Sequence, residues 1–456
     1  MPDEPATQPE GHSKTLTEGA TVTETADFEG VTFTEWADFE GVTFTKWVDC
    51  GGATFTKGAD FRAATLTRGA NFTGAKFTQV ANFGDAKFAE EAHFAGATFA
   101  GNANFRGATF AEGANFSRDA TSAEGAFEEE ADFECAKFNQ LANFAGVNFA
   151  GLANFKDGKF TDGANFEGAK FTQSANFAGA TFIDKFPNEI YTAGEGGAHF
   201  KGAKFAEEAN FKGVKFKGPA DFVGVEFSDK ANFESATFAE GADFAGATFK
   251  GVVWFNNSEM KSQTSFDDAS FRHTPPLFEG AKLHEGTTWF GATWPRSTGA
   301  KEDERLTVRA YERLKLEMDK LKKHEDELKF FVLELQARRV LAGKWSTVHG
   351  LAISIYGCLC DYGRSYSRPL WLLGAITVLG TGPFLAHFGI SAWRGSMALS
   401  AANTFGILGL RRDFFPPSVI IELPWTLKLL SAVQTIAGAV LFFLFGLSVR
   451  NKFRMR

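Results

Sequence analysis

The chain has 456 residues, enough for about two or three domains, and its formal net charge of −8 is unevenly distributed. Residues 1–20 carry −3, residues 21–290 carry −15, and residues 291–456 carry +10. The acidic excess of the longest part argues against direct binding of nucleic acid, and the four cysteines include no paired zinc spacing, so we expect no nucleic acid, metal or other cofactor.

The N-terminal segment, residues 1–20, is polar and rich in Glu, Thr and Pro. It contains no apolar stretch of the kind found in a secretory signal. Because such a composition buries little apolar surface, we expect a disordered N-terminal arm.

Phenylalanine recurs through residues 21–298 with an alternating spacing of five and six residues, in an 11-residue unit A-[N/D]-F-x-G-A-x-F-x-x-x. Within each A-x-F triplet, Ala and Phe lie two residues apart, so in an extended strand both face one side and the middle residue faces water. The spacing does not fit the 3.6-residue period of a helix, and Gly supplies the turns. The pattern therefore predicts an all-β solenoid in which units stack and bury their Phe and Ala side chains together. The Phe ladder that we predict for its core comprises Phe83, Phe88, Phe94, Phe99, Phe105, Phe110, Phe144, Phe149, Phe155, Phe160, Phe166, Phe171, Phe233, Phe238 and Phe244.

This unit resembles the pentapeptide-repeat family, in a Phe-rich variant where five-residue and six-residue units alternate. The resemblance implies a right-handed quadrilateral β-helix in which two 11-residue units form one coil. The span would then contain roughly a dozen coils at about 4.8 Å each, a rod roughly 55 Å long.

The repeat is interrupted twice, by Ser117–Glu130 and by Ile183–Ala198, and it weakens after Phe271. We expect the second interruption to be a loop that leaves the coil. Such a loop is either a partner-binding element or a neutral insertion. After Phe271 we expect the repeat to end and to be capped.

Residues 299–346 change character, with little Gly and many Glu, Lys, Arg and Leu. Leucine recurs every seven residues, which is typical of a coiled coil, although Glu325 and Arg339 interrupt the second seam position. The alternative is one amphipathic helix that packs on the last coil or on a bilayer surface. The candidate seam comprises Leu314, Leu321, Leu328 and Leu335.

Residues 347–456 contain two long stretches without charged residues, and we predict membrane spans near residues 369–390 and 429–449. Basic residues flank the outer ends of the two spans more densely than the connection between them, which places both chain ends in the cytoplasm. Residues 362–370 and 445–454 also resemble the two-span tail of some bacterial pentapeptide-repeat proteins. We therefore expect a multi-pass protein of the inner (plasma) membrane, with the solenoid and the C-terminus in the cytoplasm.

The connection between the spans includes Ser400–Leu410, where a two-span channel has its pore helix and filter. No T-V-G-Y-G filter is present, so the alternative is an amphipathic loop resting on the bilayer. On the second span, small and polar side chains share one face, which favours helix–helix packing in lipid. These candidate packing residues are Ser431, Gln434, Thr435 and Gly438.

No catalytic motif is present in the sequence, so we expect a protein that is not an enzyme. Our preferred hypothesis is a membrane-anchored cytoplasmic platform for an unknown protein partner, assembled as a homo-oligomer. The first alternative is a two-span ion-channel-like protein gated through its solenoid. The second is a DNA mimic that binds a topoisomerase, a role that the resemblance suggests because quinolone-resistance members of the family act in this way.

Overall fold

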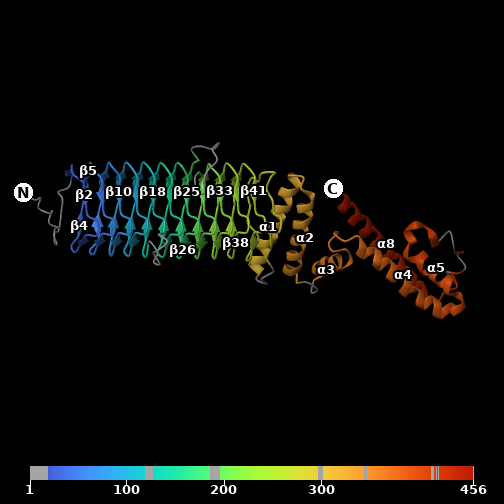
Figure 1. Cartoon of the computed structure of the whole chain (residues 1–456). Coiled ribbons are helices and arrows are strands. Elements are labelled where there is room, and N and C mark those ends of the chain that lie inside the picture. The colour runs from blue at the N-terminus through green and yellow to red at the C-terminus, as the bar shows by residue number, and fades with distance from the viewer. Residues whose placement is uncertain are drawn as a thin grey trace, which may run out of the picture. The chain divides into compact units, whose positions relative to one another are not determined.

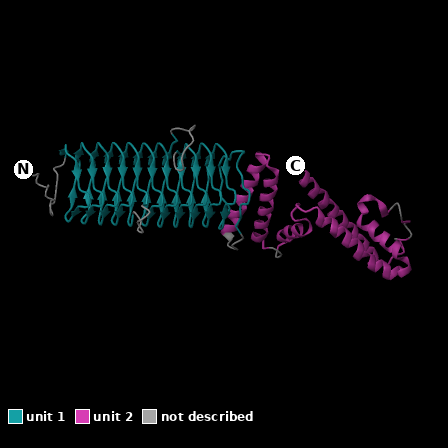
Figure 2. Cartoon of the chain, viewed as in Figure 1, with its two compact units in different colours: residues 1–296 teal, residues 297–456 magenta. Residues whose placement is uncertain are grey.

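A computed structural model describes residues 19–118, 127–184, 196–295, 301–343, 347–411, 415–416, 419 and 421–454. The chain divides into two compact units, Met1–Arg296 and Ser297–Arg456, and each is considered by itself (Figure 2). Most of the predicted N-terminal arm, residues 1–18, lies outside the described residues.

The first unit is a parallel β-solenoid of about 11 turns, built from strands of two residues (Figure 1). Hydrogen-bonded partners lie 22 residues apart in regular coils, as in the pairing of Thr21 with Thr43. One coil comprises β12 (Ala81–Asn82), β13 (Lys87–Phe88), β14 (Ala92–His93) and β15 (Thr98–Phe99). Four strands per coil give four faces, as the quadrilateral prediction requires.

The four faces are continuous stacks of parallel strands. One carries 11 strands from β1 (Thr21–Val22) to β40 (Glu259–Met260), and a second carries 11 from β2 (Ala26–Asp27) to β41 (Thr264–Ser265). A third carries 10 from β4 (Ala37–Asp38) to β39 (Val253–Trp254). The fourth is divided into four strands from β3 (Thr32–Phe33) to β15 and six from β22 (Asn148–Phe149) to β42 (Ser270–Phe271), and Phe127 bridges the two parts.

Tight turns close the two-residue gaps between successive A-x-F triplets. The N–H of Ala86 donates to the carbonyl of Phe83 at 3.1 Å, and Asp85 between them has a φ of +57°. The corresponding turn of the preceding half-coil has Gly74, with a φ of +65°. A positive φ at the third residue is characteristic of a type II turn, which explains why Gly is frequent there.

The Phe side chains form columns in which rings of successive coils lie parallel. The ring centroids of Phe83 and Phe105 are 4.8 Å apart with an interplanar angle of 2°, and Phe83 meets Phe94 edge-on at 5.5 Å. All fifteen Phe residues of the predicted ladder are buried. Stacked and edge-on pairs each contribute about 0.5–1.5 kcal/mol beyond area burial, so every coil adds the same kind of stabilisation.

The residue between Ala and Phe has a structural role that the sequence analysis did not predict. Asn82 accepts a hydrogen bond from the backbone N–H of Gly84 at 3.1 Å through its side-chain oxygen, which caps the turn. The same oxygen accepts a hydrogen bond from the side-chain amide of Asn104 in the next coil, at 3.0 Å. An Asn ladder of this kind continues at Asn154 and Asn176, so it connects coils on the outside as Phe does inside.

The interruptions leave the Phe columns intact. Phe127, which the sequence analysis did not place in the ladder, stacks between Phe99 and Phe149 at centroid distances of 4.8 and 5.0 Å. Most of both interruptions, residues 119–126 and 185–195, lies outside the described residues, including most of the loop predicted to leave the coil.

The weakening after Phe271 is a shift of phase rather than the immediate end of the solenoid. Isolated bridges join Trp254 to Leu277 and Ser270 to Thr293, 23 residues apart instead of 22. Tryptophan then replaces phenylalanine in the last turn: Trp289 stacks on Phe266 at 4.5 Å and Trp294 on Phe271 at 5.3 Å. The inserted residue does not interrupt the columns, which Phe278, Trp289 and Trp294 continue.

In the second unit, the prediction of one continuous helix or coiled-coil seam over residues 299–346 is wrong. The chain forms a helical hairpin of α1 (Lys301–Lys320) and α2 (His324–Leu341). Leu321 lies in the turn between them, where Lys322 has a φ of +57° and the N–H of Lys323 donates to the carbonyl of Met318 at 2.9 Å. A left-handed residue at this position ends a helix, and because it is Lys rather than Gly the sequence carries no stop signal.

The hairpin also buries different residues from the predicted seam. Leu314 is buried, but Leu328 and Leu335 are half-buried, and α2 instead buries Phe330, Val332, Glu334 and Ala337. The Glu334 carboxylate lies 2.6 Å from the Lys315 ammonium and 2.7 Å from the Arg338 guanidinium. A buried carboxylate is tolerated here because it has two cationic partners.

The remaining helices are α3 (Val348–Cys360), α4 (Ser367–Phe388), α5 (Trp393–Thr404) and α8 (Trp425–Arg454), with short 3₁₀ turns η1 (Ile390–Ala392) and η2 (Gly406–Leu408) on either side of α5. α5 packs against both α4 and α8. Phe384, Leu399, Leu423 and Leu427 form the apolar core that these helices share.

Candidate membrane region and its polar cluster

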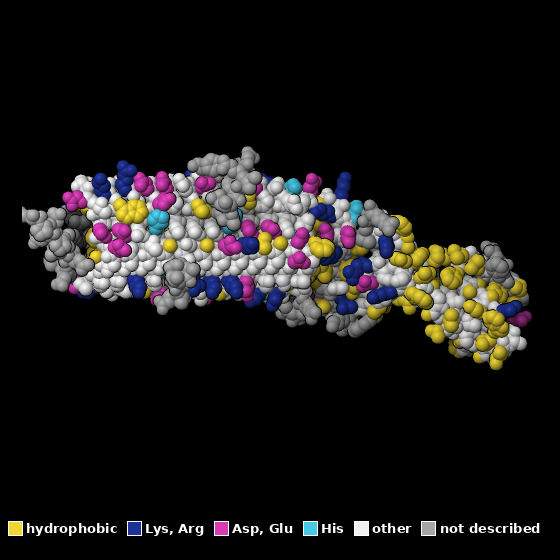
Figure 3. Space-filling model, viewed as in Figure 1, with side chains coloured by type: hydrophobic (Ala, Val, Ile, Leu, Met, Phe, Trp, Pro, Cys, Tyr) yellow, Lys and Arg dark blue, Asp and Glu magenta, His cyan; other side chains and the backbone are white. Residues whose placement is uncertain are grey.

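α4 and α8 are long and apolar enough to cross a membrane. Their mean hydropathies are 1.5 and 2.0, and only 28% of each apolar window is buried within the chain. A core helix of a water-soluble protein would be mostly buried, whereas here Trp371 is 80% exposed and Leu379 is 76% exposed. Hydrophobic side chains accordingly gather on the surface over these helices (Figure 3).

A cluster of polar side chains is buried where α4, α5 and α8 meet. The Gln434 amide of α8 donates to the Ser400 hydroxyl of α5 at 2.9 Å and to the Ile376 carbonyl of α4 at 3.3 Å. The Ser400 hydroxyl donates to the Thr377 carbonyl of α4 at 2.7 Å. Gln434 therefore links all three helices, and its amide would be costly to bury without these partners.

Asn403 of α5 completes this cluster. Its amide donates to the Ser431 hydroxyl at 3.1 Å and to the Gln434 side-chain oxygen at 3.3 Å. Its side-chain oxygen accepts no hydrogen bond from the part of the chain that the structure describes, although the residue is fully buried. Four hydrogen-bonded side chains on two helices, Ser400 and Asn403 of α5 and Ser431 and Gln434 of α8, fix the position of α5 more narrowly than apolar packing does.

Two glycines, Gly380 of α4 and Gly438 of α8, lie where neighbouring helices approach closely. A Cβ atom at Gly438 would lie 1.8 Å from the Thr404 carbonyl oxygen, and one at Gly380 would lie 1.7 Å from the Gln434 amide nitrogen. Small residues at such crossings are characteristic of helix packing in membranes. Gly438 therefore leaves room for α5, and Gly380 leaves room for the Gln434 side chain of α8.

The four candidate packing residues of the second span lie near one another on α8. Ser431, Gln434 and Gly438 contact α5 as described, and a Cβ atom at Gly406 would lie 3.0 Å from the Thr435 methyl group. The sequence analysis missed Asn403 and the helical form of α5. The run of small and polar residues that begins at Ser400 could have predicted both. The sequence analysis considered this run as a pore segment but did not pair it with α8.

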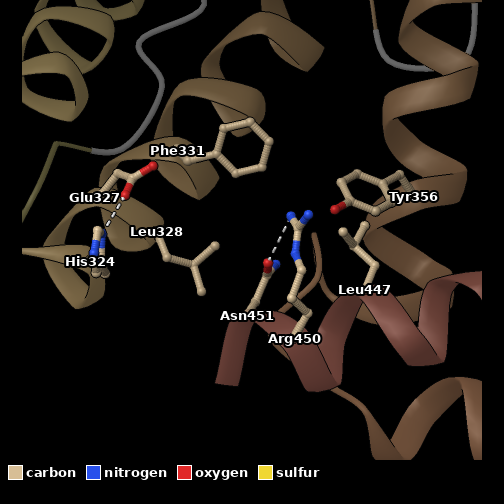
Figure 4. Close-up of a pocket in the computed structure, with 8 residues that line it drawn as sticks. All are labelled: His324, Glu327, Leu328, Phe331, Tyr356, Leu447, Arg450 and Asn451. Atoms are coloured by element: carbon tan, nitrogen blue, oxygen red, sulfur yellow. Dashed lines mark hydrogen bonds and ion pairs between the residues drawn. The ribbon is translucent and has the colours of Figure 1, made fainter. Parts of the chain in front are cut away.

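A cavity of about 240 Å³ lies among α2, α3 and the last turns of α8 (Figure 4). The His324 ring and the Glu327 carboxylate form a hydrogen bond at 3.1 Å at one side, while Arg450 and Asn451 line the other. Burial raises the pKa of Tyr356 in this wall above its ordinary value, with a contribution from Cys360, and Arg450 opposes the rise. The cavity thus combines an apolar floor with separated polar groups.

Among the described residues, two groups of side chains bring three potential metal-ligand atoms within 4.8 Å of one another: Glu134, Cys135 and Asp157 in the solenoid, and Asp319, His324 and Glu327 in the hairpin. In the first group, Glu134 already pairs with Arg106 at 2.8 Å. In the second group, the His324 ring and the Glu327 carboxylate are hydrogen-bonded at 3.1 Å. We assign no metal to either group.

Comparison with protein-family models shows a match to pentapeptide repeats (9 copies) over residues 18–65, 61–109 and 211–259. No curated protein and no solved structure matches the chain. The matched segments lie in the parallel solenoid, whose 22-residue coils and Phe columns extend the same unit beyond them. The solenoid therefore contains pentapeptide repeats, and two helices that follow it in the chain are long and apolar enough to cross a membrane.

Proposed function

We propose that this chain is a non-enzymatic protein of the bacterial inner membrane, whose solenoid is a rigid cytoplasmic platform for a protein partner. The observation that carries the proposal is the apolar surface that α4 and α8 leave uncovered. A large apolar side chain kept in water forgoes about 1.5–3 kcal/mol of burial, and insertion into lipid recovers this free energy.

The distribution of charge supports a topology with both ends in the cytoplasm. Arg364 and Arg368 precede α4 or lie in its first turn, and Arg450 and Lys452 lie in the last turns of α8. Cytoplasmic segments next to membrane spans carry an excess of Lys and Arg. The solenoid, which precedes the first span, then lies on the cytoplasmic side.

The solenoid suits a platform because its surface is regular. Each coil repeats the same backbone hydrogen bonds and Phe stacking as its neighbours, so exposed side chains stand in rows at fixed intervals. Stacked repeats of this kind typically provide extended binding surfaces. We further propose that the protein forms a homo-oligomer through the exposed faces of α4 and α8.

Membrane insertion and topology can be tested by chemical labelling of one native and one introduced cysteine. Cys135 is exposed on the solenoid, and a Ser391→Cys variant places a thiol between the spans. An impermeant maleimide added to spheroplasts should label Ser391→Cys at once and Cys135 only after lysis. Release of the protein by alkaline carbonate, or labelling of Cys135 in intact spheroplasts, would contradict the proposal.

The platform role is tested by chemical crosslinking of the full chain in cells, followed by mass spectrometry. We expect crosslinks from solenoid lysines such as Lys87 and Lys204 to one specific partner protein. A result in which the solenoid forms crosslinks only within its own chain would argue against a platform.

A second candidate function, a two-span channel-like protein, is favoured by one specific observation. α5 has 12 residues and is about 18 Å long, too short to cross a hydrocarbon core of about 30 Å, yet it packs between two helices that are long enough. This arrangement matches that of a pore helix. Ion flux into proteoliposomes that is lost in Asn403→Leu would favour the channel, and no flux from a folded oligomer would exclude it.

We do not propose the DNA-mimic alternative, because several acidic side chains of the solenoid surface are paired with lysines. Lys57 pairs with Glu35 at 2.6 Å, Lys212 with Glu234 at 3.0 Å and Lys250 with Glu226. A gyrase supercoiling assay with the full chain remains a direct test, in which inhibition at micromolar concentration would reverse this judgement.

A further inference from the structure

A second cavity, of about 340 Å³, lies where the first turns of α4 meet the last turns of α8. Its walls are formed by apolar and aromatic side chains from both helices, together with one lysine. The residues that line it are Tyr366, Leu370, Phe445, Val449, Lys452 and Phe453. We call this cavity the α4–α8 groove.

The groove is amphipathic. Leu370, Phe445 and Val449 supply aliphatic and aromatic walls, and Leu370 is 53% exposed, so the groove opens to the surroundings. The Lys452 ammonium lies 4.9 Å from the centre of the Tyr366 ring. A cation–π contact of this kind holds the positive charge beside the apolar walls.

The groove has positively charged surroundings. Lys452 lines the groove itself, and Arg368 lies in the first turn of α4. None of the described residues that line the groove carries a carboxylate. The α4 N-terminus, whose first residues also line or flank the groove, adds a partial positive charge. An anionic ligand group is therefore favoured beside Lys452.

The groove also lies at the level expected for a lipid headgroup. The long uncharged stretch of α8 ends at Val449, which lines the groove, and Lys452 lines it one helical turn later, so the groove spans the change from apolar to basic side chains. If α4 and α8 span the bilayer, this transition coincides with the cytoplasmic boundary between acyl chains and phosphates.

We propose that the α4–α8 groove binds an anionic phospholipid of the bilayer, with part of an acyl chain against Leu370, Phe445 and Val449 and the phosphate at Lys452. The inference rests on the proposed membrane insertion. It adds a specific lipid site, which insertion by itself does not require.

The experiment uses the full chain reconstituted separately with dioleoylphosphatidylglycerol and dioleoylphosphatidylcholine. Flotation with vesicles of each lipid measures insertion, and native mass spectrometry after transfer to mild detergent measures retained lipid. We expect insertion with both lipids and selective retention of phosphatidylglycerol.

Two variants and one control locate the site. Lys452→Gln should lower the affinity for phosphatidylglycerol about fivefold, the loss expected for one basic residue beside an anionic headgroup. Val449→Trp should fill the groove and reduce retention without changing the charge. Lys428→Gln removes the same charge near the start of α8, where the ammonium donates to the Ile421 carbonyl, and should retain phosphatidylglycerol like the wild type.

The outcomes separate the two proposals. Failure to float with either lipid would overturn both membrane insertion and the lipid site. Flotation with both lipids but equal retention of the two, or unchanged selectivity in Lys452→Gln and Val449→Trp, would overturn the lipid site and leave insertion standing. Circular dichroism of each variant confirms that a lost lipid is not a lost fold.

Discussion

The solenoid and the helical region are stabilised in opposite ways. In the solenoid, one contact set is repeated: Phe rings stack on the Phe rings of the next coil, and the turns close with the same backbone hydrogen bond. In the helical region, single contacts hold unlike elements together, such as Glu334 in the hairpin and Gln434 among α4, α5 and α8. The solenoid should therefore lose stability coil by coil, whereas the helical region should depend on a few residues.

The largest expected effect is that of Phe155→Ala in the middle of the solenoid. Phe155 stacks between Phe133 and Phe177, at 4.9 Å from each, and the substitution should lower the free energy of unfolding by about 3–5 kcal/mol. Thermal unfolding of the full chain, followed by circular dichroism in mild detergent, measures the change. Phe155→Leu should cost less, because Leu66 already occupies a Phe position. An unchanged melting curve for Phe155→Ala would mean that the columns do not carry the stability of the solenoid.

Glu334→Gln tests whether the hairpin depends on one residue. The substitution leaves the cations of Lys315 and Arg338 without their shared carboxylate, and we expect α1 and α2 to separate more easily by about 3 kcal/mol. Amide hydrogen exchange of α2 measures this local opening. Glu312→Gln is the control, because Glu312 is 47% exposed and contacts Arg338 only at 3.4 Å, so its loss should cost well under about 1 kcal/mol. Equal protection of the α2 amides from exchange in Glu334→Gln and Glu312→Gln would mean that the hairpin does not depend on Glu334.

Gly438→Ala tests whether the packing of α5 against α8 also depends on one residue. The added methyl group would meet the Thr404 carbonyl, so α5 must move away from α8, and we expect a loss of about 2 kcal/mol. Gly446→Ala on the same helix is the matched control, since its Cβ would meet nothing within 4 Å. Thermal stability in detergent distinguishes the two variants. A Gly438→Ala protein as stable as Gly446→Ala would show that the close approach of α5 contributes little.

The smallest expected effect concerns the ladder of Asn and Asp side chains on the outside of the solenoid, and it depends on pH. Burial raises the pKa of Asp60, the neighbouring Glu40 and Asp38 add to the rise, and Arg62 opposes it. A raised carboxyl pKa means that the folded chain loses stability as the pH rises through that pKa, and that the penalty disappears below the unfolded value.

Asp60→Asn should therefore raise stability by about 0.5 kcal/mol at neutral pH, with the gain shrinking as the pH falls into the acidic range. The new amide can also donate to Asp38, as Asn104 does to Asn82. Melting temperatures of the variant and the wild type, measured across this pH range, test the prediction. A difference between them that does not change with pH, or that has the opposite sign, would contradict it.

Much of the solenoid was predictable because its contacts repeat at a fixed interval along the chain. A shift by one residue would turn the core Phe and Ala side chains outward on every face, so the alternating Phe spacing specifies which side chains are inside. The Asn ladder was not predicted, although its residues were visible, because its hydrogen bonds run between coils and not within a unit. Phe127 was missed because its separation from Phe99 is 28 residues instead of 22.

In the helical region, the sequence alone determined that residues 299–346 are largely helical and that two later stretches are long and apolar, since charge and hydropathy are local properties. Tertiary structure decided where the first helix ends and where α5 lies. The left-handed Lys322 is accommodated because α1 and α2 then pack together, with Phe330 buried against Tyr311, and α5 is held by Gln434 and Asn403. These contacts join residues that are distant in sequence, and each occurs once, so no repeated pattern in the sequence predicts them.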